Sequence, residues 1–128
     1  MARRGFVSLV GAGPGDPGLL TLKALKRLKE ADLIIYDYLT NPQHLEHATP
    51  GTVIVGVGKG FRHKKLPQQK INALILKHAK LGHNVVRLKG GDPFLFGRGG
   101  EEALFLKEHR IDFEVVPGIT SAVACAAY

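Results

Sequence analysis

A glycine-rich string in the second half of the chain is the segment best suited to hold a ligand. It runs from Arg87 to Glu102 and reads RLKGGDPFLFGRGGEE. Gly90-Gly91 permits backbone angles that other residues avoid, so a ligand can approach the main chain closely there. Asp92-Pro93 fixes a turn that presents one carboxylate. Asp before proline often accepts hydrogen bonds from its own turn, but the length of the string favours a ligand-binding role.

A second glycine-rich turn follows the first apolar run and reads VGAGPGDPGLLT from Val10 to Thr21. The pattern predicts a strand that ends in a tight turn stiffened by prolines, with Thr21 as the N-cap of the next helix. It differs from the dinucleotide-binding fingerprint, which needs a small residue where this chain has Asp16. Pro14 also removes an amide that a pyrophosphate would use. A nicotinamide or flavin site is therefore disfavoured.

Strand-like and helix-like patterns alternate along the chain. Branched apolar runs predict strands, and apolar residues three and four positions apart predict helices. The predicted strands are Phe6–Val10, Leu33–Tyr36, Val53–Val57, Val85–Leu88 and Phe113–Val116, and the predicted helices are Thr21–Ala31, a short one after Pro42, Leu66–Leu81 and Glu101–His109. This alternation predicts an α/β fold, with a mostly parallel sheet flanked by helices in one domain.

The last segment, Ile119–Tyr128, is rich in small apolar residues and predicts a helix packed against another part of the protein. The sequence stops inside this segment without a cap or a polar tail. The pattern therefore predicts that the chain is the first part of a longer protein.

The carboxyl ends of parallel strands meet at one edge of a sheet, and open α/β sheets bind ligands there. The candidate site residues are those that follow predicted strands, namely Pro14, Asp37, Lys59, Gly90, Gly91, Asp92, Thr120 and Ser121. Thr120 and Ser121 also suit the cap of the last helix, and both roles can coexist. Asp37 is not required as a cap, because Thr40 or Asn41 lies just ahead of Pro42, and this leaves Asp37 for chemistry.

Basic residues exceed acidic ones by 18 to 11, which gives a net charge of +7 and favours an anionic partner. Lys59 lies close to Arg62, His63, Lys64 and Lys65, and on composition alone such a cluster is a solvated loop. A nucleic-acid module is disfavoured, because the aromatic residues are scattered and no Lys/Arg-Gly-Phe strand motif occurs.

The composition is that of an ordinary soluble domain, with 45% hydrophobic and 23% charged residues. The single cysteine, Cys125, cannot form an internal disulfide, and no run of about 18 apolar residues suits a membrane span. These features predict a cytoplasmic protein. The six histidines show no metal-ligand spacing, so no metal site is predicted.

Together the two glycine-rich strings resemble the two signatures of the tetrapyrrole methylases. Within that family, Phe94–Gly97 followed by Arg98 resembles the uroporphyrinogen-III C-methyltransferases. The resemblance implies S-adenosylmethionine as cofactor, S-adenosylhomocysteine as product, Asp37 as proton acceptor and Lys59 as proton donor. The implied cofactor contacts are Pro14, Gly90, Gly91, Asp92, Leu95, Thr120 and Ser121.

The resemblance also implies that residues 1–128 are the N-terminal α/β domain of a two-domain, homodimeric enzyme whose C-terminal domain is absent from this chain. Cofactor and substrate would then lie between the two domains. The implied reaction methylates two ring carbons of uroporphyrinogen III to give precorrin-2, on the route to sirohaem and cobalamin. Basic side chains would suit the several carboxylates of this substrate. The alternatives are another precorrin methyltransferase and an inactive fragment that lacks its second domain.

Overall fold

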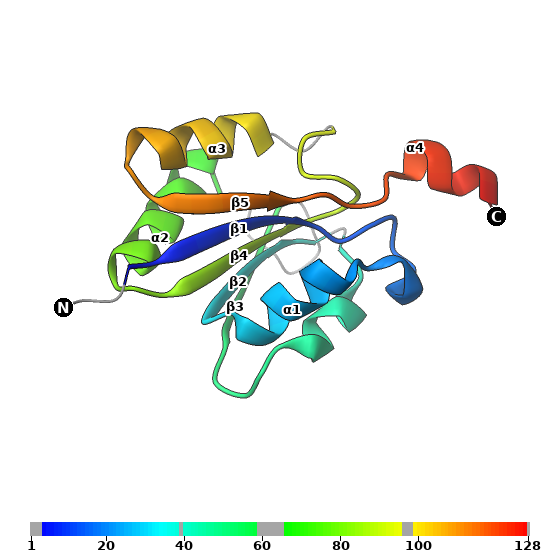
Figure 1. Cartoon of the computed structure of the whole chain (residues 1–128), viewed down its shortest axis with the longest axis horizontal. Coiled ribbons are helices and arrows are strands. Elements are labelled where there is room, and N and C mark those ends of the chain that lie inside the picture. Colours follow the sequence, from blue (N-terminus) through cyan, green and yellow to red (C-terminus); the bar gives the residue numbers. More distant parts are fainter. Residues whose placement is uncertain (1–3, 39, 59–65, 96–98, 128) are drawn as a thin grey trace.

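The protein is described by a computed structural model that covers residues 4–38, 40–58, 66–95 and 99–127. Its centre is a sheet of five parallel strands in the order β3-β2-β4-β1-β5. The strands are β1 (Phe6–Gly11), β2 (Leu33–Asp37), β3 (Val53–Val57), β4 (Asn84–Lys89) and β5 (Asp112–Val116). All of them run towards the end of the molecule at which the chain terminates (Figure 1). The predicted α/β fold with a parallel sheet is confirmed.

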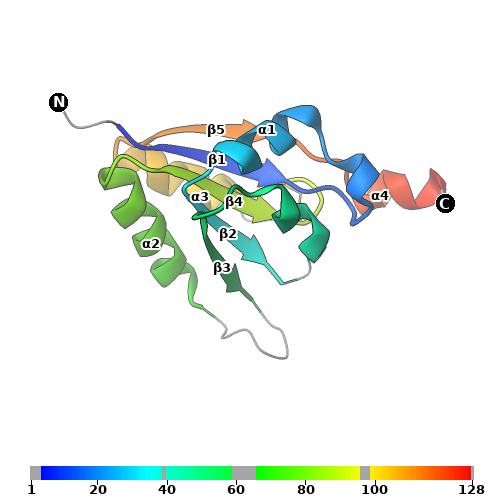
Figure 2. The same ribbon diagram turned by 90° about the horizontal axis from the view of Figure 1, so that it is seen from below.

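Helices cover both faces of the sheet, as Figures 1 and 2 show. The helices are α1 (Leu22–Glu30), α2 (Gln68–Lys80), α3 (Gly99–Glu108) and α4 (Ser121–Ala124), with 3-10 turns at η1 (Pro17–Leu19), η2 (Pro42–His47) and η3 (Cys125–Ala127). Helix α1 and η2 lie on one face, and α2 and α3 lie on the other.

Each face of the sheet has its own apolar core, because successive side chains of a strand point to opposite faces. On strand β4, Val85 packs under α2 and α3, whereas Val86 and Leu88 pack under α1. Arg87 and Lys89 therefore share the α2–α3 face with Val85. Two cations on a buried strand face need charged partners, and these partners are part of the candidate site.

Local signals in the sequence set the ends of several elements. The hydroxyl of Thr21 accepts a hydrogen bond from the Ala24 amide at 3.1 Å, so the predicted N-cap of α1 is confirmed. Asn41 caps η2 by accepting from the Gln43 amide at 3.0 Å. Gly82 follows α2 with a φ of 84°, a left-handed conformation that suits a helix stop.

The end of the chain differs from the prediction. Instead of one packed helix over Ile119–Tyr128, four helical residues are followed by the 3-10 turn η3. Val123 is 67% exposed, and Ala124 is the one buried residue of α4. Figure 1 shows this segment extending beyond the ends of the strands. The apolar pattern of this segment therefore predicted burial correctly for Ala124 but not for Val123.

Candidate functional site

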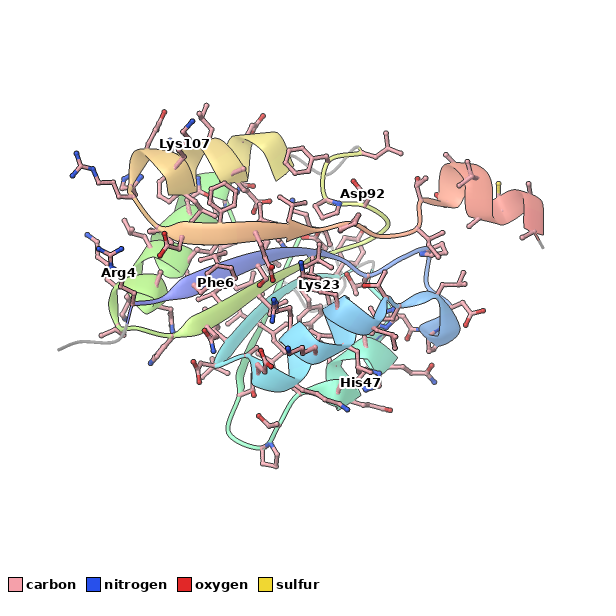
Figure 3. All side chains as sticks on the ribbon, in the orientation of Figure 1. Arg4, Phe6, Lys23, His47, Asp92 and Lys107 are labelled. Carbon is pink, nitrogen blue, oxygen red and sulfur yellow. The ribbon has the colours of Figure 1, made fainter. Side chains whose placement is uncertain are left out.

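A cleft of about 490 Å³ lies at the carboxyl ends of the strands. Its walls come from the loops that follow β1, β2, β3 and β4 and from the start of α4. The lining residues are Gly13, Pro14, Gly15, Asp37, Tyr38, Thr40, Asn41, Gly58, Lys89, Gly90, Gly91, Leu95, Thr120 and Ser121. Figure 3 shows the same end of the sheet, where Asp92 lies, opposite the end that carries Arg4 and Phe6.

The structure brings most of the predicted site residues together. Pro14, Asp37, Gly90, Gly91, Leu95, Thr120 and Ser121 all line the cleft. Their convergence follows from the parallel topology and is confirmed, whereas their contact with a cofactor stays a prediction. Asp92 is not among the residues that line the cleft. Lys59 and the basic cluster that follows it lie outside the described residues.

Four glycines lie where the loops of the cleft approach one another. The Gly13 and Gly91 backbones exchange hydrogen bonds of 3.2 and 2.8 Å, which join the loops after β1 and β4. A Cβ on Gly11 would collide with the carbonyl oxygen of Gly91 and with the backbone of Gly118. Only residues without side chains permit three strand ends to pack this closely.

Gly90 and Gly91 differ in what they contribute. A Cβ on Gly90 would meet no atom within 4 Å, so its backbone borders open space in the cleft. Gly91 has a φ of 64°, a left-handed conformation in which side-chain-bearing residues are strained. Gly90 therefore leaves room for a ligand, and Gly91 makes the turn.

Asp92 behaves as the turn carboxylate that was the alternative interpretation of the sequence. Its Oδ2 accepts from the Phe94 amide at 3.0 Å, and its Oδ1 accepts from the Gly118 amide at 3.0 Å. Both oxygens thus hold backbone groups of the site loops. A direct contact between Asp92 and a cofactor stays a prediction.

Thr120 and Asn41 combine structural and cleft-lining positions. The hydroxyl of Thr120 accepts from the Ala122 amide at 3.3 Å and caps α4, which confirms the capping role. The side-chain amide of Asn41 donates to the carbonyl oxygen of Gly15 at 2.7 Å and joins the loops after β1 and β2. The hydroxyl of Thr40 is buried in the cleft wall and has no hydrogen-bond partner among the described residues.

Asp37 ends β2, and its side chain is 33% exposed where it lines the cleft. The expectation that Asp37 is not required as a cap is confirmed, because Asn41 caps η2. Asp37 nevertheless has a structural contact, since its Oδ1 accepts a 2.8 Å hydrogen bond from Nη2 of Arg87. Residues 37 and 87 are joined because β2 and β4 are neighbours in the sheet, an arrangement that the sequence pattern does not reveal.

Three buried charged residues were missed by the sequence interpretation. Arg87 Nε lies 2.9 Å from Oε2 of Glu102, and Lys89 Nζ lies 2.5 Å from Oε1 of the same carboxylate. With Asp37 they form the Arg87 network, which holds two cations and two carboxylates. The available signal was the pair Arg87 and Lys89, two residues apart in an apolar strand, which places both on one buried face.

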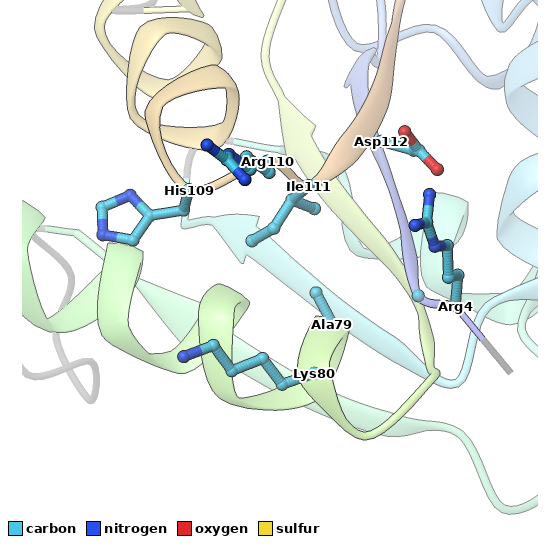
Figure 4. A pocket seen from close by; sticks show the side chains of 8 residues that line it. Arg4, Ala79, Lys80, His109, Arg110, Ile111 and Asp112 are labelled. Atoms are coloured by element: carbon cyan, nitrogen blue, oxygen red, sulfur yellow. The ribbon is translucent and has the colours of Figure 1, made fainter. Parts of the chain in front are cut away.

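The opposite end of the sheet carries a basic hollow of about 280 Å³, shown in Figure 4. Arg4, Lys80, His109, Arg110 and Asp112 line it. These side chains belong to the surface at the amino ends of the strands, away from the cleft. The basic side chains of this hollow explain part of the excess positive charge of the chain. They favour the simpler of the two interpretations of that charge, a solvated surface.

No cluster of three or more potential metal ligands occurs among the residues that the structure describes. Within the same residues, none of the helices is long and apolar enough to span a membrane.

The chain is similar to proteins of known family. A model of the tetrapyrrole (corrin/porphyrin) methylases matches residues 7–128. A uroporphyrinogen-III C-methyltransferase of Priestia megaterium is 56% identical over 97% of this chain and 52% of its own length. A siroheme synthase of Actinobacillus succinogenes is 55% identical over 98% of this chain and 26% of its own length.

The fold is also similar to solved structures. A uroporphyrin-III C-methyltransferase of Thermus thermophilus, solved with S-adenosylhomocysteine, has a TM-score of 0.76 and 51% identity. The match covers 94% of this chain and 47% of that one. The chain thus spans about half the length of the methyltransferases and about a quarter of the siroheme synthase.

Proposed function

This chain belongs to the tetrapyrrole methylases, and on that premise we propose that it is the N-terminal half of an S-adenosylmethionine-dependent uroporphyrinogen-III C-methyltransferase. The proposal covers the conversion of uroporphyrinogen III to precorrin-2, as part of sirohaem or cobalamin synthesis. It is supported by relatives of that name at about 55% identity and by the shared fold. A C-terminal domain like that of the longer relatives would complete the site.

The observation that carries the proposal is the convergence of seven of the candidate residues on one cleft, with open backbone at Gly90. A second feature of the cleft also suits a polar ligand. The buried Thr40 hydroxyl has no partner among the described residues, and burial of an unpaired hydroxyl costs free energy. A hydrogen-bonding group bound beside Thr40 would remove that cost.

The residues present fit the cofactor. Leu95 and Pro14 offer apolar surface, the hydroxyls of Thr120 and Ser121 offer hydrogen bonds, and Gly90 offers backbone that a ligand can approach. Bound there, S-adenosylmethionine supplies an electrophilic methyl group. Asp92 holds the loops of this site, and its direct contact with the cofactor stays part of the proposal.

Asp37 is proposed as the group that accepts the proton lost from the methylated ring carbon. It lines the cleft, it is partly exposed, and Arg87 holds it in place. A base must lie within hydrogen-bond reach of the proton that it removes, and a fixed carboxylate at the cleft meets that need. Lys59 is proposed to return a proton or to pair with a substrate carboxylate, and the two roles stay open.

Two further proposals concern the cellular compartment and the oligomeric state of the enzyme. The lone cysteine, Cys125, is exposed and unpaired with any other cysteine, which suits a reducing compartment such as the cytoplasm. The resemblance implies a homodimer, and sedimentation of the complete protein would test this state.

The experiment is an assay of the complete protein that contains this chain, with S-adenosylmethionine carrying a labelled methyl group. We expect transfer of two methyl groups to uroporphyrinogen III and formation of S-adenosylhomocysteine. Matched reactions would contain a later precorrin in place of uroporphyrinogen III. Transfer to the later precorrin alone would favour another precorrin methyltransferase, and no transfer to either would overturn the proposal.

A further inference from the structure

We propose that Arg87 is the positioning residue of the site and acts through Asp37. Its guanidinium holds the Asp37 carboxylate at the cleft, and Glu102 of α3 fixes the guanidinium in turn. The inference rests on the proposed function, because it requires Asp37 to take part in methyl transfer.

The geometry of Arg87 is that of a fixed fork. Its Nη2 donates to Asp37 Oδ1 at 2.8 Å, and its Nε donates to Glu102 Oε2 at 2.9 Å. Its Nη1 donates to the carbonyl oxygens of Ile35 at 3.5 Å and Leu88 at 3.4 Å. A planar guanidinium with partners on three nitrogens cannot rotate without losing several bonds. The position of Arg87 therefore fixes the position of the Asp37 carboxylate.

The Arg87 network reaches solvent through one residue. The side chains of Arg87 and Lys89 are 4% exposed and that of Glu102 is 0% exposed, whereas that of Asp37 is 33% exposed. The exposed part of Asp37 lines the cleft. Lys89 also borders the cleft but is almost fully buried, so Asp37 is the member of the network that a substrate can reach most easily.

Stability alone does not account for such a network. Burial of ions carries a large desolvation penalty, and apolar residues in their place are often as stable or more stable. Strand β4 has an apolar alternative on the same face, since Val85 packs there into the core. Buried ions at the cleft end, together with their single exposed carboxylate, point to a role in orienting Asp37.

The Arg87 network also joins the two ends of the loop that is proposed to bind the cofactor. Arg87, which precedes the loop, donates to the carboxylate of Glu102, which lies fifteen residues further on and follows the loop. Lys89 also precedes the loop and contacts the same carboxylate. Gly90, Gly91 and Leu95 lie between these anchors. When Arg87 is replaced, Lys89 and Glu102 still join the two ends of the loop. Loss of Arg87 should therefore act on Asp37 more than on cofactor binding.

The test is a double-mutant cycle in the complete protein that contains this chain. The variants are Arg87→Met, Asp37→Asn and the combination of both. We measure kcat and KM with uroporphyrinogen III, the dissociation constant of S-adenosylhomocysteine and the thermal unfolding midpoint. Arg27→Met is the matched control, because Arg27 also pairs with carboxylates, those of Glu114 and Glu30, on the opposite face of the sheet.

We expect Arg87→Met to lower kcat by roughly ten- to a hundredfold, the usual effect of a misplaced catalytic group, while KM and cofactor affinity change by less than about threefold. In the Asp37→Asn background the same replacement should lower kcat by less than about threefold, because the group through which Arg87 acts is already lost. Arg27→Met should leave kcat within about threefold of the parent.

Arg87→Lys serves if Arg87→Met does not fold, because lysine keeps the buried charge but lacks the fork. It should also lower kcat in the parent background and have little effect beside Asp37→Asn. If the kcat losses of the two single variants multiply in the double variant, the positioning role is overturned. An unchanged kcat in either Arg87→Met or Arg87→Lys would also overturn it. An unchanged kcat in Asp37→Asn would overturn both this inference and the proposed base, whereas a parent protein without methyl transfer would overturn the proposed function itself.

Discussion

Oδ1 of Asp92, in the turn after β4, accepts a hydrogen bond of 3.0 Å from the amide of Gly118, which follows β5. Its other oxygen, Oδ2, accepts from the Phe94 amide at 3.0 Å. One carboxylate thus joins two loops of the cleft that lie 26 residues apart in the sequence. Both acceptor oxygens of Asp92 are therefore needed to hold these two loops in place.

Asp92→Asn should loosen both loops. Asparagine has one acceptor oxygen, so one backbone amide loses its partner and faces an NH₂ group instead. We expect a loss of about 1–3 kcal/mol in unfolding free energy, together with weaker S-adenosylhomocysteine binding. Urea unfolding and calorimetric titration would measure the two effects.

The matched control for Asp92 is Asp16→Asn, because Asp16 also accepts from a turn amide, that of Gly18 at 2.8 Å, at an exposed position. Its effect on stability should stay within about 0.5 kcal/mol. Lost cofactor binding at full stability in Asp92→Asn would show instead that Asp92 contacts the cofactor directly.

Gly90→Val should impair cofactor binding and leave the fold intact. A Cβ at this position would meet no protein atom within 4 Å, and Gly90 lines the cleft, so the added side chain should take up cleft space. We expect cofactor affinity to fall at least roughly tenfold, about 1.4 kcal/mol, with less than about 1 kcal/mol lost in stability. Gly91→Ala is the comparison, because its φ of 64° should cost about 1–2 kcal/mol in stability. Normal affinity in a folded Gly90→Val protein would place the cofactor elsewhere.

Asp37→Asn should remove the proposed base and keep its shape. Asparagine Oδ1 can still accept from Arg87, so the fold and the cofactor dissociation constant should change little. We expect kcat to fall by roughly a hundredfold or more, the usual contribution of a positioned general base. Steady-state rates with uroporphyrinogen III, measured beside cofactor affinity, test this. A kcat within about threefold of the parent, a barrier change below roughly 1 kcal/mol, would contradict the assignment.

Glu114 should make the stability of the fold depend on pH. Burial opposes the charge of Glu114, but hydrogen bonds from Arg27, Ser8 and Lys23 outweigh it and hold the pKa of this carboxyl below its usual value of 4.5. A carboxyl with a lowered pKa in the folded state stabilises the fold above the unfolded pKa. That stabilisation is lost as the pH falls below about 4.5.

The corresponding test is Glu114→Gln, examined by urea unfolding over a pH series. The variant should be about 1–3 kcal/mol less stable near pH 7, and the difference from the parent should shrink below pH 4.5. Glu108→Gln, at an exposed position of α3, is the control and should show no such trend. A difference that is constant across the series would exclude this source of pH dependence.

The sequence by itself determined the strands, the helices before the last segment and the edge of the sheet at which the site lies. Periodic apolar residues located the strands, and Thr21 and Gly82 marked helix ends, because these signals act between residues that are close in the chain. The parallel topology then required the carboxyl ends of the strands to meet. Six of the seven cleft residues were predictable on that ground, whereas Leu95 was implied only by the resemblance to the family.

Tertiary structure decided which side chains in the site hold one another. The contacts of Asp37 with Arg87 and of Asp92 with Gly118 join residues far apart in the chain, so no local pattern signals them. They depend on the order of the strands, in which β4 lies beside β2 and β1 lies between β4 and β5. Hydrophobic periodicity shows which face of a strand is buried but not where that strand lies in the sheet, and side chains hold one another only where the fold brings them into contact.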